Sequence, residues 1–166
     1  MKAFAVTGGA AFVAVLVAPL VITDWREAAP LLLFHAVLLL NTYFSIRCFS
    51  RIIPPSNRVQ RQIDIGLFFL YLALPFSFGN PRLFVSLNLT LFIIATLKYV
   101  HLGQILGPSK LVRRKIRVDA FGILFCLAAL FGVIAGHAFF ATVLFASIFL
   151  AANVYFIFIN PLYKNP

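Results

Sequence analysis

Unbroken apolar segments are the feature that most constrains what this chain can fold into. Leu31–Leu40 and Leu124–Ile134 are apolar on nearly every face. Because a backbone in lipid must satisfy its own hydrogen bonds, only helices or a closed barrel can cross a bilayer. Barrel strands alternate apolar and polar residues over about 10 positions, and these segments do not. The sequence therefore predicts an all-α protein whose helices cross a membrane.

Composition leads to the same conclusion. Hydrophobic residues account for 63% of the 166 residues, the mean hydropathy is +1.03, and 11% of the residues are charged. Soluble domains carry about 25% charged residues, so water cannot be the solvent for most of this surface. Cys48 and Cys126 are too few for a disulfide framework, and we expect both to be unpaired packing residues.

Six segments have the length of about 20 residues that a bilayer requires. They are approximately Ala3–Ile22, Ala28–Phe49, Ile63–Gly79, Leu83–Leu102, Asp119–Gly136 and His137–Leu162. Short turns connect them in pairs, which predicts one transmembrane domain over residues 1–166, built from helical hairpins at about 3–49, 63–102 and 119–162. The first segment exceeds the hydrophobic region of a signal peptide, about 7–15 residues, so we expect it to be a transmembrane helix.

Lys and Arg residues gather at one end of these spans. Only Arg26 and Arg82 fall on the opposite side. The other twelve of the fourteen are Lys2, Arg47, Arg51, Arg58, Arg61, Lys98, Lys110, Arg113, Arg114, Lys115, Arg117 and Lys164. Because basic residues collect in the cytoplasm, we predict that both termini are cytoplasmic, together with two basic loops at about 50–62 and 103–118. The bacterial cytoplasmic (inner) membrane is the expected location.

The second basic loop carries more charge than orientation requires. Five of its residues are basic: Lys110, Arg113, Arg114, Lys115 and Arg117. Each contributes about 1 kcal/mol near anionic lipid, so we predict that the loop contacts anionic lipid head groups. An acidic surface on a partner protein is the alternative. Nucleic acid is not an expected partner for so short a segment.

Two segments resemble each other at an offset of 53 residues, with matches at Pro55-Ser56 and Pro108-Ser109, Arg61 and Arg114, and Phe68 and Phe121. In each, a Pro-Ser turn and a basic stretch lead into a predicted helix with an early aspartate. A duplicated hairpin explains the match, and convergence of cytoplasmic loops on Pro, Ser and Arg is the alternative. We expect Asp64 and Asp119 to cap these helices rather than to carry protons.

Small residues recur every four positions in three of the predicted spans, including the sixth, which contains Ala138, Thr142 and Ala146. The first contains Ala10, Ala14 and Ala18, and the fifth contains Ala128, Gly132 and Gly136. Small side chains allow helix backbones to approach closely in lipid. We expect these ridges to pack inside the bundle, and contact with another subunit or a second copy of the chain is the alternative.

Four polar residues deep in the spans are candidates for a substrate pocket: His35, Asn41, Asn88 and Asn153. Asparagine is equally suited to hydrogen bonding between helices. His35 and His137 are the only histidine pair on one side of the membrane and so the only candidate haem ligands. Otherwise the sequence predicts neither a cofactor nor a metal site.

No convergent group of catalytic residues is evident in the sequence. The leading hypothesis is a non-enzymatic subunit or scaffold of a membrane assembly, with other membrane proteins or further copies of the chain as partners. The alternative is a unit that binds or transports a small apolar or lipid-like molecule. A lipid-acting membrane enzyme is the third hypothesis.

Overall fold

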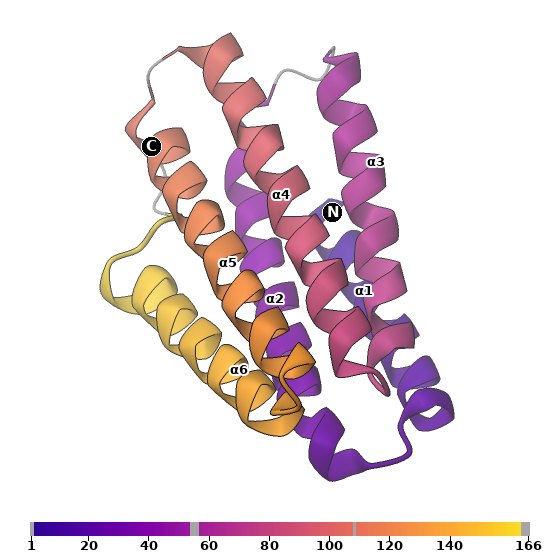
Figure 1. Ribbon diagram of the computed structural model, residues 1–166. Helices are drawn as coiled ribbons and strands as arrows, with labels where there is room; N and C mark the ends of the chain where they lie inside the picture. Colours follow the sequence, from indigo (N-terminus) through magenta and orange to yellow (C-terminus); the bar gives the residue numbers. More distant parts are fainter. Residues whose placement is uncertain (1, 54–56, 108, 164–166) are drawn as a thin grey trace.

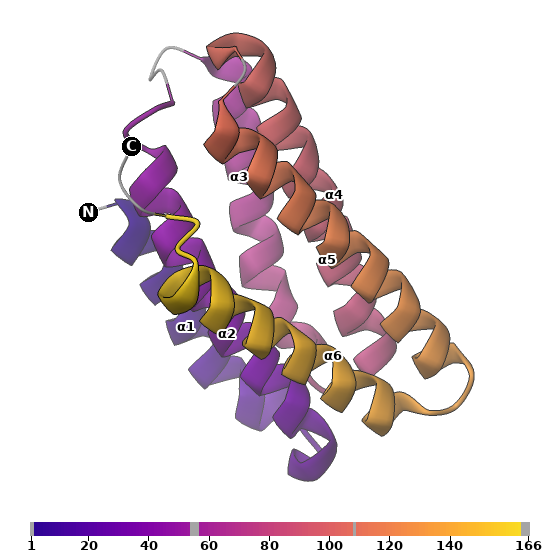
Figure 2. The same ribbon diagram turned by 90° about the vertical axis from the view of Figure 1, so that its left-hand side faces the viewer.

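The six α-helices of the described residues run side by side and turn back at two ends of the molecule (Figures 1 and 2). The computed structural model describes residues 2–53, 57–107 and 109–163. The elements are α1 (Lys2–Val21), α2 (Trp25–Phe49), α3 (Arg58–Ala73), η1 (Leu74–Ser77), α4 (Pro81–Leu106), α5 (Lys110–Ile134), α6 (Ala138–Val154) and η2 (Tyr155–Ile159). The all-α prediction is confirmed.

Five helices are long and apolar enough to cross a membrane: α1, α2, α4, α5, and α6 together with η2. Helix α3 has 16 residues and is the shortest of the six α-helices in the described residues. Its axis continues into η1, a 3-10 helix of four residues that contains Pro75. These lengths and compositions are those of a helical integral membrane protein.

The basic segment before the fifth span is helical, which corrects the predicted loop at 103–118. Helix α4 continues to Leu106, Gly107 follows with φ +77°, and Ser109 is the N-cap of α5. Lys and Arg favour helices, so the segment extends α5 rather than interrupting it. Four residues used in the sequence analysis lie outside the described residues: Pro55, Ser56 and Pro108 of the proposed repeat, and Lys164 of the charge count.

Asp64 and Asp119 do not cap helices, contrary to the prediction. The side chain of Asn57 caps α3 by accepting a hydrogen bond from the backbone of Gln60, and α5 begins after Ser109. Both aspartates therefore lie inside their helices, where a carboxylate needs a side-chain partner instead of free backbone N–H groups.

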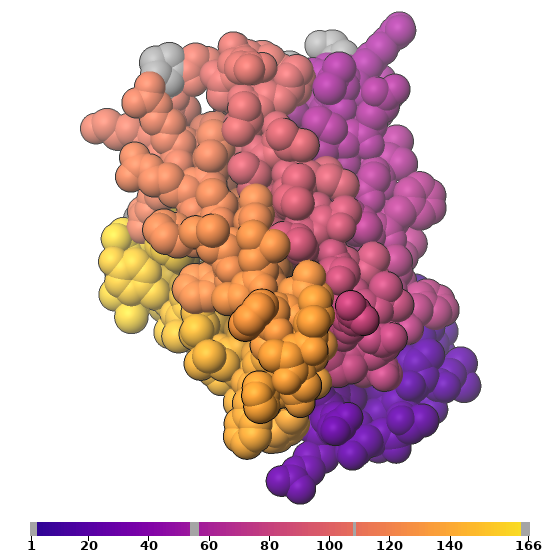
Figure 3. Space-filling model, in the orientation of Figure 1, coloured from indigo at the N-terminus to yellow at the C-terminus, as the bar shows by residue number. Residues whose placement is uncertain are grey.

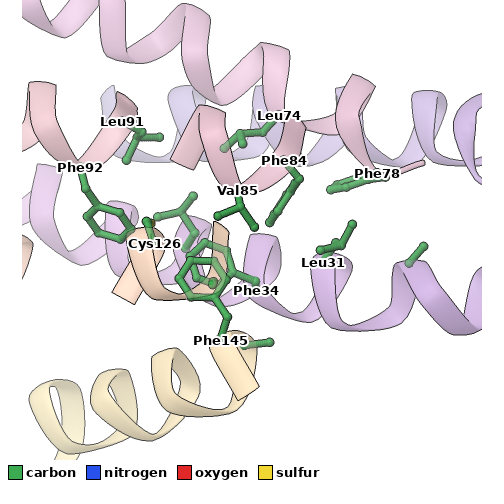
Figure 4. Close-up of a cluster of buried hydrophobic side chains, with 14 of the residues drawn as sticks. Leu31, Phe34, Leu74, Phe78, Phe84, Val85, Leu91, Phe92, Cys126 and Phe145 are labelled. Atoms are coloured by element: carbon green, nitrogen blue, oxygen red, sulfur yellow. The ribbon is translucent and has the colours of Figure 1, made fainter. Parts of the chain in front are cut away.

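Aromatic packing forms the apolar core between α2, α4, α5 and α6 (Figure 4). Phe34 is fully buried and stacks on Phe145 and Phe149, with ring centroids 4.3 and 4.2 Å apart. Phe84 meets the edge of Phe34 at 5.8 Å. Dispersion contacts of this kind hold helices together in lipid, where no hydrophobic driving force acts between them.

The small-residue ridges are used mainly inside the chain. Ala10 and Ala18 are buried, and α1 packs on α2 and η1. A Cβ atom at Gly132 would lie 2.9 Å from the Cβ of Ala141, so α5 and α6 approach closely there. Ala128 is exposed, and Gly136, with φ +87°, follows the end of α5 instead of contributing to a ridge.

Replacing Gly132 with Leu should therefore destabilise the bundle, because the added side chain cannot fit against Ala141. We expect a loss of about 1–3 kcal/mol in the free energy of unfolding, measured by SDS titration with circular dichroism. Ala128→Leu, one helical turn away on an exposed face, is the matched control and should leave the transition unchanged. Equal stability of both variants would place the α5–α6 contact elsewhere.

Candidate functional site

A buried ion pair lies within α5. Lys115 Nζ is 2.6 Å from Asp119 Oδ1, and the exposed fractions of the two residues are 5% and 1%. The spacing of four residues places both side chains on one face of the helix. That face points into the bundle, so the pair is shielded from lipid and solvent.

A second pair joins α3 to α4. Lys98 Nζ is 2.6 Å from Asp64 Oδ1, and the aspartate side chain is 47% exposed. The Nζ atoms of Lys98 and Lys115 lie 5.5 and 5.4 Å from the ring centroid of Tyr99, within the range of cation–π contact. We use the name Lys–Asp cluster for five residues: Asp64, Lys98, Tyr99, Lys115 and Asp119. Its two cations and two carboxylates cancel, which favours its burial.

Hydrogen bonds connect the Lys–Asp cluster to α2. The hydroxyl groups of Tyr99 and Ser45 are 2.7 Å apart. Thr42 donates to the hydroxyl oxygen of Tyr71 at 2.9 Å, and Tyr163 donates to Asn41 Oδ1 at 2.5 Å. Four helices, α2 to α5, and the C-terminal segment therefore share one polar interior at the end of the bundle that carries the basic residues.

The C-terminal segment is folded back onto the bundle. Element η2 is a π-helix, after which the N–H of Leu162 donates to the carbonyl of Phe156 at 2.7 Å. Arg114 donates to the carbonyl of Asn160 at 2.9 Å. Burial raises the pKa of the Tyr163 hydroxyl, so this group stays protonated and can donate to Asn41.

A cavity of about 220 Å³ lies beside the Lys–Asp cluster, between α5 and α6. Its polar wall consists of Asp119, Asn41 and Asn153. The remaining lining residues are apolar: Phe92, Val118, Phe121, Gly122, Phe125, Phe145, Ile148, Phe149, Ala152, Phe156 and Leu162. Such a site, apolar with a few converging polar groups, is typical of small-molecule binding.

The cavity extends to the outer surface of α5. Phe121 and Phe125 line it, yet they are 60% and 41% exposed. Helix α5 covers much of the face shown in Figure 3, with the C-terminal segment at its side. This surface belongs to helices that are long and apolar enough to cross a membrane.

Two of the four predicted pocket residues line this cavity. Asn41 and Asn153 do so, whereas Asn88 is buried in α4 and donates to the carbonyl of Phe84 at 2.9 Å. His35 is buried against Phe78, with ring centroids 5.4 Å apart, and neither of its nitrogens has a hydrogen-bond partner. Asn88 and His35 therefore do not line this cavity, and their place in a substrate pocket stays a prediction.

The candidate haem ligands occupy different environments. His35 lies in the core, whereas His137 is exposed at the N-cap of α6. No group of three or more His, Cys, Asp or Glu residues suited to a metal ion occurs among residues 2–53, 57–107 and 109–163.

The basic residues of α5 separate into two sets. Lys110, Arg113 and Arg117 are exposed, and Arg114 is half-buried with its guanidinium 5.6 Å from the centroid of the Phe156 ring. Lys115 is buried and paired with Asp119, which leaves it poorly placed for the predicted contact with lipid or a partner. Four residues remain for such a contact.

Sequence reasoning missed the functional potential of Asp119 and Lys115. Their spacing of four residues was the available signal, because a helix beginning at Lys110 places them on one face. That signal was lost when the basic segment was interpreted as a loop.

No family model, curated protein or solved structure matches the chain.

The two ion pairs should respond differently to the loss of a charge. Asp119→Asn leaves the ammonium group of Lys115 buried without its counter-charge and should cost about 3–5 kcal/mol. Lys115→Met with Asp119→Leu removes both charges and should recover most of that loss. Asp64→Asn also removes the counter-charge of a buried lysine, Lys98, but water reaches this half-exposed site, so the cost should be smaller than at Asp119. SDS titration measures all three, and equal costs at Asp64 and Asp119 would contradict the difference in burial.

Proposed function

We propose that the protein binds a small apolar or lipid-like molecule within the membrane. The cavity between α5 and α6 carries this proposal, because it combines an apolar lining with a polar wall of Asp119, Asn41 and Asn153. Its position at lipid-exposed Phe121 and Phe125 gives a molecule dissolved in the bilayer a route to the site. Both binding and transport of such a molecule require a route from the bilayer to the site.

A role as subunit or scaffold is the alternative. Small-residue ridges supported it in the sequence, but Ala10, Ala18 and Gly132 are engaged within the chain. The exposed residues Lys110, Arg113 and Arg117 support an accessory contact with anionic lipid head groups, since they lie together on the first two turns of α5.

We further propose six membrane spans with both termini in the cytoplasm of a bacterial cell. Helix α3 and η1 together cover residues 58–77, about 32 Å at the rise of α- and 3-10 helices. That length suffices for a hydrocarbon core of about 30 Å. The basic starts of α3 and α5 lie at the same end of the bundle, in agreement with the positive-inside rule (Figure 1).

Cysteine labelling tests this orientation. Cysteines introduced at exposed Thr23 and His137 should react with an impermeant maleimide in intact cells. Cysteines at exposed Gln62 and Gln104 should react only after permeabilisation. The native Cys48 and Cys126 are buried and provide the background control. Labelling of the Gln104 position from outside would reverse the proposed topology.

Ligand occupancy can be measured with fluorobenzene and ¹⁹F NMR on the purified protein in mild detergent. We expect a saturable bound signal beyond the partitioning seen in protein-free micelles. Ala152→Leu adds bulk inside the cavity and should remove this signal, whereas Ala151→Leu, on the neighbouring exposed position of α6, should preserve it. If wild type shows no saturable signal, or if both variants retain it, the cavity is not the binding site.

A further inference from the structure

We infer that the molecule recognised by this cavity is an aromatic ring bearing a neutral hydroxyl group, which donates a hydrogen bond to Asp119. The inference rests on the proposed function and specifies the chemistry of its ligand. It follows from the hydrogen-bonding state of Asp119, the charge around it, and the size and lining of the cavity.

Asp119 has unused hydrogen-bonding capacity in the cavity wall. Its Oδ1 accepts from Lys115 at 2.6 Å, whereas its Oδ2 is buried without a hydrogen-bond partner. A buried carboxylate oxygen without a partner is energetically costly, and an ionised carboxylate can only accept. A ligand that donates a hydrogen bond here satisfies an atom that the described residues leave unsatisfied.

The surrounding charge favours a neutral donor over a cationic one. Lys115 already neutralises Asp119. Lys98, which pairs with Asp64, contacts the same Tyr99 ring as Lys115. An ammonium group at Asp119 Oδ2 would add a positive charge beside Lys115 in a region of low dielectric constant. A hydroxyl group supplies the hydrogen without that charge. A phenolic hydroxyl, with a pKa of about 10, keeps its proton at neutral pH.

The dimensions and lining of the cavity fit one aromatic ring. A buried apolar cavity of about 150 Å³ holds benzene, and this one measures about 220 Å³. Six phenylalanines line it: Phe92, Phe121, Phe125, Phe145, Phe149 and Phe156. Aromatic rings pack on one another edge-to-face or offset, which favours a ring over a flexible chain. Larger substituents can leave the cavity between Phe121 and Phe125 toward lipid.

Three fluorinated rings separate hydroxyl recognition from apolar binding. 4-Fluorophenol donates a hydrogen bond, 4-fluoroanisole can only accept one, and fluorobenzene does neither. In ¹⁹F NMR titrations of the full chain, corrected for partitioning into detergent, 4-fluorophenol should bind about tenfold or more tightly than either of the others. The gain reflects a hydrogen bond to a charged acceptor.

The variant carrying Lys115→Met and Asp119→Leu removes the acceptor together with its counter-charge, so that no buried ion remains unpaired. It should bind the three rings with similar affinity, while Asp64→Asn should keep the preference of the wild type. Equal wild-type affinities for 4-fluorophenol and fluorobenzene would overturn the hydroxyl inference and leave the apolar site intact. A preference that persists in the double variant would overturn the role of Asp119. Failure of all three rings to bind wild type would overturn the proposed function as well.

Discussion

The buried pair of Lys115 and Asp119 determines how the basic end of the bundle is organised. Charges inside a membrane bundle are stable only when they are paired and screened from lipid by neighbouring helices. The pair requires α5 to turn one face inward from its second turn, and it places Tyr99 and Ser45 around that face. Exposed Arg113 and Arg117 then lie on the opposite face of the same helix. One helix thereby supplies both the polar interior and a cationic surface.

The remaining interior is held together by aromatic contacts rather than by charge. Phe34 contacts rings from α4 and α6, and Phe92 of α4 meets Phe149 of α6 at 6.0 Å. The cavity lies where this aromatic region meets the Lys–Asp cluster, with Phe92 and Asp119 both in its wall. The cavity therefore has both an apolar and a polar wall, and the proposal of an amphiphilic ring as its ligand rests on this location.

Sequence reasoning predicted the membrane class because the signal, a long apolar helix, is local. Helix starts were predicted less well, because a run of Lys and Arg is compatible with either a cytoplasmic loop or an amphipathic helix turn. Asn41 and Asn153 were identified as pocket candidates from their depth in the spans. These two residues line one cavity with Asp119 because of the way α2, α5 and α6 pack together. Nothing within a single segment indicates that packing. The surroundings of His35 could not be predicted for the same reason, since its neighbour Phe78 comes from a distant part of the chain.

The folded-back C-terminal segment links the cationic surface to the cavity. Arg114 donates to the carbonyl of Asn160 and lies against the ring of Phe156. Phe156 and Leu162 in turn form part of the cavity wall. The chain leaves the helix after the π-helical turn η2, and Leu162 then packs inward with its N–H donating to the carbonyl of Phe156. π-Helical turns are frequent at functional sites. The contacts of Arg114 with Asn160 and Phe156 therefore hold in place the segment that contributes Phe156 and Leu162 to the cavity wall.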